Sequence, residues 1–166
     1  DEPCTLGETD IDRIVRHVEG RIRVSPIEKA PFHHVNFSEA LPISVYEQLL
    51  ARLPMDSALE DIDHPEARLP DGRVTRRLLA LTEASLERFA ADDREFWIVL
   101  SRALTSRLLL EALVEKFLVA LSARFGANLP DMVSVPIYYR DYPGYRIGIH
   151  PDTPKKILTM QLYLPS

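Results

Sequence analysis

The sequence predicts an α+β fold in which a helical layer packs against one face of a largely antiparallel sheet. Apolar residues recur at helical spacing in the tract that ends at Phe125, whereas the segment after Pro130 is rich in Val, Ile, Tyr and Thr. The order of the elements, with most helices before most strands, favours this layered arrangement. We expect one domain over residues 1–166.

The first half of the chain predicts two helices, three short strands and a loop. Apolar residues on one face predict helices over residues 9–19 and 44–53, which Gly20 and Pro54 are expected to end. The other expected elements are strands at 21–24, 31–37 and 73–81 and an exposed loop at 54–72, a candidate lid or substrate loop.

The second half predicts a long helical tract followed by three strands. The tract runs from Asp92 to Phe125, and we expect two helices, broken near Thr105-Ser106 and stopped by Gly126. The predicted strands cover residues 133–140, 145–149 and 156–164.

Composition and charge narrow the classes of function. The 166-residue chain is 46% apolar and 27% charged, as in an ordinary globular domain. A net charge of -5 argues against nucleic acid or anionic membrane as partner, because both require clustered Lys and Arg. The sequence has no apolar run of membrane-spanning length, and its start lacks the features of a signal peptide. We expect a cytoplasmic location, with which the lone Cys4 agrees.

His150 and Asp152 form the pattern that points most directly to chemistry. Residues i and i+2 of an extended segment project from the same side, so this His-Pro-Asp sequence can place an imidazole and a carboxylate on one ion. These are two of the three ligands in the 2-His-1-carboxylate site of non-haem Fe(II) oxygenases. The alternative is a turn in which His150 and Asp152 hydrogen-bond and Pro151 fixes the bend.

The stretch from Tyr139 to Pro165, YRDYPGYRIGIHPDTPKKILTMQLYLP, resembles the first half of the catalytic core of Fe(II)/2-oxoglutarate-dependent dioxygenases, especially the prolyl-hydroxylase-like branch. The shared features are the Tyr-Pro-Gly turn, a strand ending in His-x-Asp and a strand ending in Tyr-Leu-Pro; they cover about the last fifth of the chain. The resemblance implies a double-stranded β-helix (jelly-roll) core that begins near residue 130, with residues 1–129 as the supporting region.

This resemblance implies roles for five residues. His150 and Asp152 would be the iron ligands at the catalytic centre. Tyr142 would lie near the 2-oxoglutarate site, Tyr163 would offer its hydroxyl to the distal carboxylate of 2-oxoglutarate, and Thr159, on the same strand face, would be a further contact. The family completes its site with a distal His and an Arg or Lys further along the chain, so we expect the natural protein, and the second half of its core, to continue beyond this sequence.

The implied function is hydroxylation of an unactivated C–H bond in a small molecule, amino acid or peptide, with O2 and 2-oxoglutarate as co-substrates. Asp152 disfavours halogenation, because related halogenases carry Gly or Ala at that position. One alternative is a catalytically inactive binding module that retains the oxygenase fold. Another is a cupin-like metal protein, although such sites draw several His from one strand pair and this segment offers one.

Other polar residues have ordinary explanations beside functional ones. His33-His34 resembles a metal-binding pair, but adjacent strand residues point to opposite faces, which favours two surface side chains. Arg73, Arg76 and Arg77 fit an anionic substrate, and they fit a solvated strand edge better. Tyr163 is alternatively a half-buried strand tyrosine.

Overall fold

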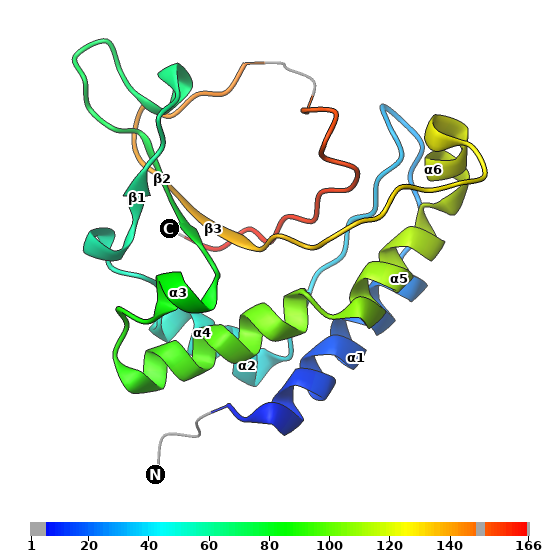
Figure 1. Ribbon diagram of the computed structural model, residues 1–166, viewed down its shortest axis with the longest axis horizontal. Helices are drawn as coiled ribbons and strands as arrows, with labels where there is room; N and C mark the ends of the chain where they lie inside the picture. Colours follow the sequence, from blue (N-terminus) through cyan, green and yellow to red (C-terminus); the bar gives the residue numbers. More distant parts are fainter. Residues whose placement is uncertain (1–5, 149–151, 166) are drawn as a thin grey trace.

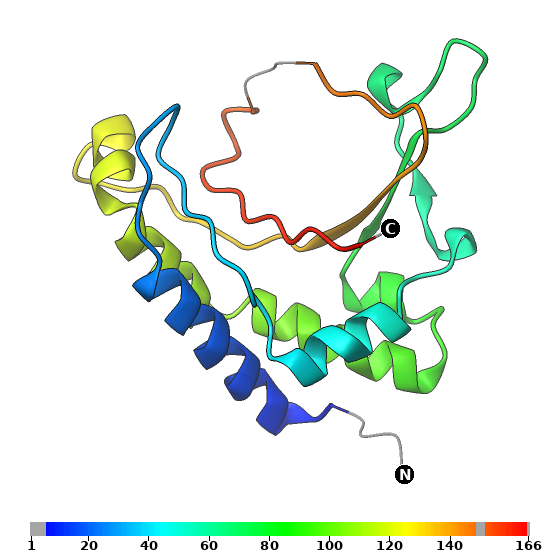
Figure 2. The same ribbon diagram turned by 180° about the vertical axis from the view of Figure 1, so that it is seen from behind.

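The structure, a computed structural model, describes residues 6–148 and 152–165 (Figure 1). Its helices gather on one side of the molecule, and a three-stranded sheet and the C-terminal segment lie on the other (Figures 1 and 2). None of the helices in the described ranges combines the length and apolar character needed to cross a membrane.

Helix α1 (Glu8–Val24) is longer than predicted and does not end at Gly20. Its apolar stripe continues to Ile22, which is 2% exposed, and this burial outweighs the cost of a glycine inside a helix, about 1 kcal/mol. The predicted strand at 21–24 is therefore wrong. Helix α1 packs against α4 (Ala91–Leu104) and α5 (Arg107–Lys116).

The remaining helices follow the sequence pattern more closely. Helix α2 (Ile43–Ala51) agrees with the prediction, and the break between α4 and α5 falls at Thr105-Ser106 as expected. Ser106 accepts a hydrogen bond from the backbone N–H of Leu108, which caps α5. The tract contains a third helix that was not predicted, α6 (Leu118–Phe125), and ends at Gly126 with a positive φ of 79°. The short helix α3 (Glu83–Leu86), capped by Thr82, was also not predicted.

The sheet has the order β1-β2-β3 and is antiparallel throughout. Its strands are β1 (Glu60–Asp61), β2 (Arg76–Ala80) and β3 (Ile137–Asp141), and two short 3-10 turns, Asp56–Ala58 and Pro65–Ala67, flank β1. Strands β2 and β3 fall close to the predicted strands at 73–81 and 133–140. Strand β1 lies inside the segment predicted to be a loop.

The described residues form one three-stranded sheet and no jelly-roll core, so the predicted fold class is wrong; the chain is mixed helix and sheet. Residues 31–37 make a single bridge, Glu28 with His34, and residues 145–148 and 156–164 form no strand. The physical reason is that β-propensity describes how well side chains fit a sheet, whereas a strand also needs a partner for its backbone N–H and C=O groups. Residue 149 lies outside the described residues.

The core lies where the helical layer meets the sheet, and Trp97 is at its centre. The Trp97 side chain is 2% exposed, and its Nε1–H donates to the carbonyl of Arg52, just after α2, at 3.0 Å. Its ring contacts the edge of Phe96 at 5.6 Å and of Tyr138, on β3, at 6.1 Å between centroids. One side chain thus joins α4, α2 and the sheet.

We expect Trp97→Ala to lower the free energy of unfolding by about 3–5 kcal/mol, because it removes a large buried ring and its hydrogen bond. Urea denaturation followed by far-UV circular dichroism measures this loss. Val119→Ala is the matched control: Val119 is 82% exposed, and its truncation should change stability by less than about 0.5 kcal/mol. A Trp97→Ala protein as stable as this control would contradict the assigned role.

Candidate functional site

The Tyr-Pro-Gly turn of the predicted oxygenase pattern is present directly after β3. The N–H of Tyr145 donates to the carbonyl of Tyr142 at 3.0 Å, with Pro143 and Gly144 at the two central positions. Gly144 has a φ of 95°, and a Cβ at this residue would lie 3.3 Å from the side chain of Leu69. Only glycine meets both conditions without strain, as in a type II turn.

Asp56 is the centre of a hydrogen-bond cluster beside this turn. Its Oδ1 accepts from the guanidinium of Arg140 and, at 2.9 Å, from the hydroxyl of Tyr142. The hydrogen bond from Arg140 is the main cause that holds the pKa of Asp56 below its usual value, with Tyr142 second. Burial, and then the hydrogen bond to Asp56, raises the pKa of Tyr142. At neutral pH the pair is therefore a carboxylate and a neutral phenol.

The end of the sheet beside this cluster carries two facing cations. Arg77 on β2 lies directly opposite Arg140 on β3, next to the cross-strand pair of buried Leu79 and partly buried Tyr138. Asp61 on β1 lies opposite Arg77 in turn, and its carboxylate accepts from Arg77 Nε at 2.8 Å. The sheet face that covers the core is thus apolar at one end and cationic at the other.

A hollow of about 290 Å³ lies between these groups. Its lining residues are Asp56, Arg73, Val74, Arg77 and Tyr142. They come from the 3-10 turn before β1, from the loop before β2, from β2 itself and from the turn after β3, so the hollow forms only when these distant segments pack together.

The three arginines near β2 differ in environment. Arg73 is exposed and donates to Asp71 at 2.8 Å, which fits a solvated strand edge. Arg76 pairs across the strands with Asp141 and lies over the rings of Tyr139 and Tyr145, 4.9 and 4.0 Å from their centroids. Cation–π contact of this kind fixes the turn to the outer face of the sheet.

Of the two predicted iron ligands, the structure describes one. His150 lies outside the described residues. Asp152 is exposed, and Oδ1 of its carboxylate accepts a hydrogen bond from Lys156 Nζ at 2.9 Å. Arg124, in α6, donates to the carbonyls of Pro154 and Lys156 and so holds the segment that follows Asp152. Residues 6–148 and 152–165 contain no group of three or more His, Cys, Asp or Glu side chains that could hold a metal.

Thr159 and Tyr163, the predicted 2-oxoglutarate contacts, are exposed and lie in a segment without strand structure. The two residues were predicted to share one face of a strand, and this segment forms no strand. Tyr163 is 84% exposed, and its hydroxyl donates to Gln161 at 2.6 Å, so it is not a half-buried strand tyrosine either. Within the described chain, neither residue is hydrogen-bonded to Tyr142.

The histidine pair does not form a joint site. Nδ1 of His34 is hydrogen-bonded to the carbonyl of Phe32 at 2.8 Å, and its Nε2 lies 3.5 Å from the carboxylate of Glu28. The side chain of His33 is exposed. Two separate surface side chains account for the pair.

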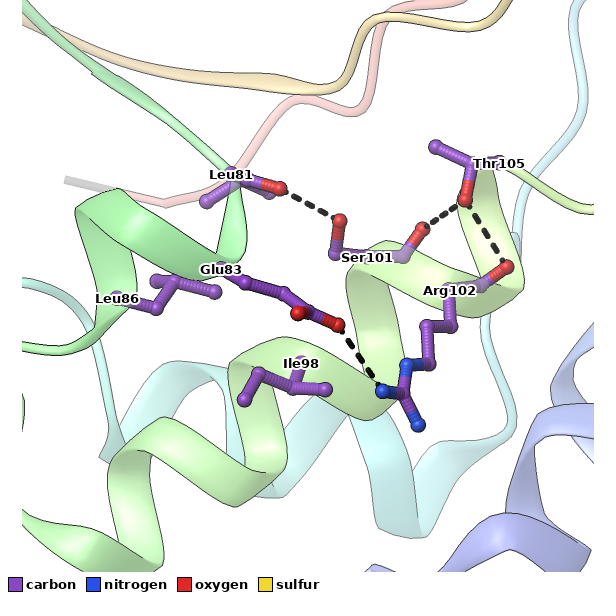
Figure 3. A pocket seen from close by; sticks show the side chains of 7 residues that line it. All are labelled: Leu81, Glu83, Leu86, Ile98, Ser101, Arg102 and Thr105. Atoms are coloured by element: carbon purple, nitrogen blue, oxygen red, sulfur yellow. Dashed lines mark hydrogen bonds and ion pairs between the residues drawn. The ribbon is translucent and has the colours of Figure 1, made fainter.

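A second, smaller hollow of about 210 Å³ lies between α3 and α4 (Figure 3). Its polar groups bind one another: Arg102 pairs with Glu83 at 3.0 Å, and the hydroxyl of Ser101 donates to the carbonyl of Leu81 at 2.6 Å. The hydroxyl of Thr105 donates to the carbonyl of Ser101. This hollow therefore lies at the junction of two helices, and the hydrogen bonds described use its polar groups within the protein.

Comparison of the chain with protein-family models, with curated proteins and with solved structures found no match.

Asp56 and Arg140 are site residues that the sequence did not indicate. They are 84 positions apart, Asp56 in an aperiodic loop and Arg140 in a strand, so no local spacing connects them. The weak signal available was an arginine directly before the Asp-Tyr-Pro-Gly sequence.

We expect the carboxyl group of Asp56 to titrate below the usual value of about 3.9. A lowered pKa stabilises the fold above the unfolded-state pKa, and this stabilisation is lost as the pH falls through the folded-state value. Asp56→Asn should therefore cost about 1 kcal/mol or less at neutral pH, since the group is largely exposed, and less still below pH about 4.

Carbon-13 NMR of the carboxyl groups measures this titration. Arg140→Gln should raise the Asp56 midpoint toward the usual value, whereas Arg107→Gln, at an exposed arginine paired with Glu111, should leave it unchanged. An Asp56 midpoint that does not respond to loss of Arg140 would contradict the assigned cause.

Proposed function

We propose that this protein is an Fe(II)- and 2-oxoglutarate-dependent oxygenase that hydroxylates an unactivated C–H bond of a small molecule, amino acid or peptide. The observation that carries the proposal is the sequence His150-Pro151-Asp152, placed eight residues after Tyr142 and followed by Thr159 and Tyr163. The cytoplasm is the proposed location, since its reducing conditions suit ferrous iron.

The Tyr-Pro-Gly turn supports the proposal. The oxygenase pattern requires this turn before the His-x-Asp sequence, and the turn is present with a glycine conformation that other residues rarely adopt. Tyr142, the turn residue expected near 2-oxoglutarate, lines a hollow that also contains two arginines. Two arginines beside Tyr142 suit one of the two carboxylates of the co-substrate.

The two predicted ligands, an imidazole and a carboxylate, are of the types that bind Fe(II). An imidazole from His150 and a carboxylate from Asp152 are ligands that ferrous iron accepts, and they leave other coordination positions open. Bound iron would supply the Lewis acid and redox centre at which 2-oxoglutarate and O2 react. The ion pair between Asp152 and Lys156 is exposed, with the two side chains 47% and 56% accessible, so it is weak enough to yield to a metal ion.

A binding module without catalysis is the second candidate. The observation that favours it is the hydrogen bond of Asp152 to Lys156, which gives this carboxylate a partner other than a metal. In this case the hollow at Tyr142 would be a ligand site in its own right.

Anaerobic addition of Fe(II) and then 2-oxoglutarate tests the proposal through the visible metal-to-ligand charge-transfer band of the chelate. We expect a band in the full-length wild-type protein that needs both additions. Substitutions His150→Ala and Asp152→Ala should abolish it, because each removes a ligand. His64→Ala is the control: this side chain is exposed, and the variant should give the wild-type band.

Absence of the band in the folded, full-length wild-type protein would rule out the oxygenase and leave the binding module. A band that persists in His150→Ala would show that the iron is held elsewhere. Succinate formed from 2-oxoglutarate in air, measured in the same variants, should follow the band.

A further inference from the structure

We propose that the hollow beside Tyr142 binds the carboxylate of a small organic molecule through Arg77 and Arg73. The binding step does not depend on iron. Only the choice between two sources of the carboxylate, the substrate or 2-oxoglutarate, rests on the proposed oxygenase function.

The first argument is the cation pair across β2 and β3. Like charges directly opposite one another in a sheet are destabilising, yet Arg77 and Arg140 occupy such positions. Asp61 and Asp56 offset the repulsion, one beside each arginine. Where a chain retains an arrangement that costs stability, a functional role is the first explanation to test.

The second argument is the balance of charge. Four guanidiniums, those of Arg68, Arg73, Arg77 and Arg140, are paired in this region with three carboxylates, those of Asp56, Asp61 and Asp71. Asp61 is shared, because it accepts from Arg68 at 3.3 Å and from Arg77 at 2.8 Å. Two arginines and one aspartate line the hollow itself, and this surplus of one positive charge suits one negative charge on a ligand.

The third argument is the supply of hydrogen-bond donors. Arg77 uses only its Nε–H on Asp61, and among the described residues its Nη groups have no hydrogen-bond acceptor. The two Nη groups carry four of the five N–H donors of the guanidinium and form a planar edge that matches a carboxylate. Arg73, 73% exposed, lies at the same hollow and adds a second guanidinium.

The walls of the hollow define the rest of the ligand. The hydroxyl of Tyr142 donates to Asp56, so this residue offers its ring, and Val74 adds apolar surface for a carbon chain. Asp56 is ionised and repels a second negative charge inside the hollow, so the hollow takes one carboxylate and the other carboxylate of a dicarboxylate would lie outside it. Because the hollow is small, about 290 Å³, and has a surplus of one charge, a carboxylate on a short carbon chain fits better than a phosphate dianion.

Titration of the metal-free protein with glutarate tests the proposal. Glutarate has the carbon length of 2-oxoglutarate and lacks the keto group needed for chelation. We expect the ¹⁵N–¹H signal of the Arg77 Nε to shift on binding. We expect Arg77→Gln to weaken glutarate binding at least about tenfold, because the charge-assisted hydrogen bonds to the carboxylate are lost.

The variant is suited to this test because Asp61 keeps its partner Arg68 when Arg77 is replaced. Arg77→Lys keeps the charge without the fork and should bind with intermediate affinity. Arg107→Gln removes an equal charge far along the chain, on α5, and should bind like the wild type. Circular dichroism confirms that each variant is folded.

Equal glutarate binding by the wild type, Arg77→Gln and Arg107→Gln would overturn the proposal, as would inorganic phosphate binding more tightly than glutarate. The charge-transfer band distinguishes the two sources of the carboxylate. If Arg77→Gln needs a higher concentration of 2-oxoglutarate to form the band, the hollow binds the co-substrate. If the concentration needed is unchanged, the hollow binds the substrate. If no protein gives a band, the oxygenase proposal fails while the glutarate result still stands.

Discussion

The buried indole of Trp97 connects the helical layer to the sheet, and the arrangement of both layers depends on it. Its N–H holds the carbonyl that follows α2, and its ring packs against Phe96 and Tyr138. Tyr138 is the cross-strand neighbour of the fully buried Leu79, so the contact fixes β3 and, through it, β2. Because β2 and β3 are fixed at their apolar end, the positions of Arg77 and Arg140 at the cationic end are fixed as well.

The two facing arginines of the sheet lie directly beside its apolar end. Arg77 and Arg140 lie one step beyond the cross-strand pair of Leu79 and Tyr138. Both arginines are half-buried, and each lies beside an aspartate. The aspartate partners are more exposed than the two arginines, and a guanidinium retains its charge at this depth. A chain with a net charge of -5 thereby presents a local cationic hollow, and the overall charge does not reveal it.

What the sequence could predict was local. Helical periodicity located α2, α4 and α5, and the sequence Pro143-Gly144 predicted the turn after β3. Both signals depend on residues that are only a few positions apart. The jelly-roll prediction failed because residues 145–148 and 156–164 have strand-forming side chains without a partner strand. The pairing of Asp56 with Arg140 could not be predicted, since it depends on how distant segments fold together.

The pairing of β2 with β3 has a consequence for the order in which the chain acquires structure. It closes a loop of residues 81–136 that contains α3, α4, α5 and α6. Closing such a loop costs entropy that the two strands recover only once the intervening helices have packed. During synthesis from the N-terminus, the helical layer can therefore form around α1 while the hollow does not yet exist, because Tyr142 is still to be added.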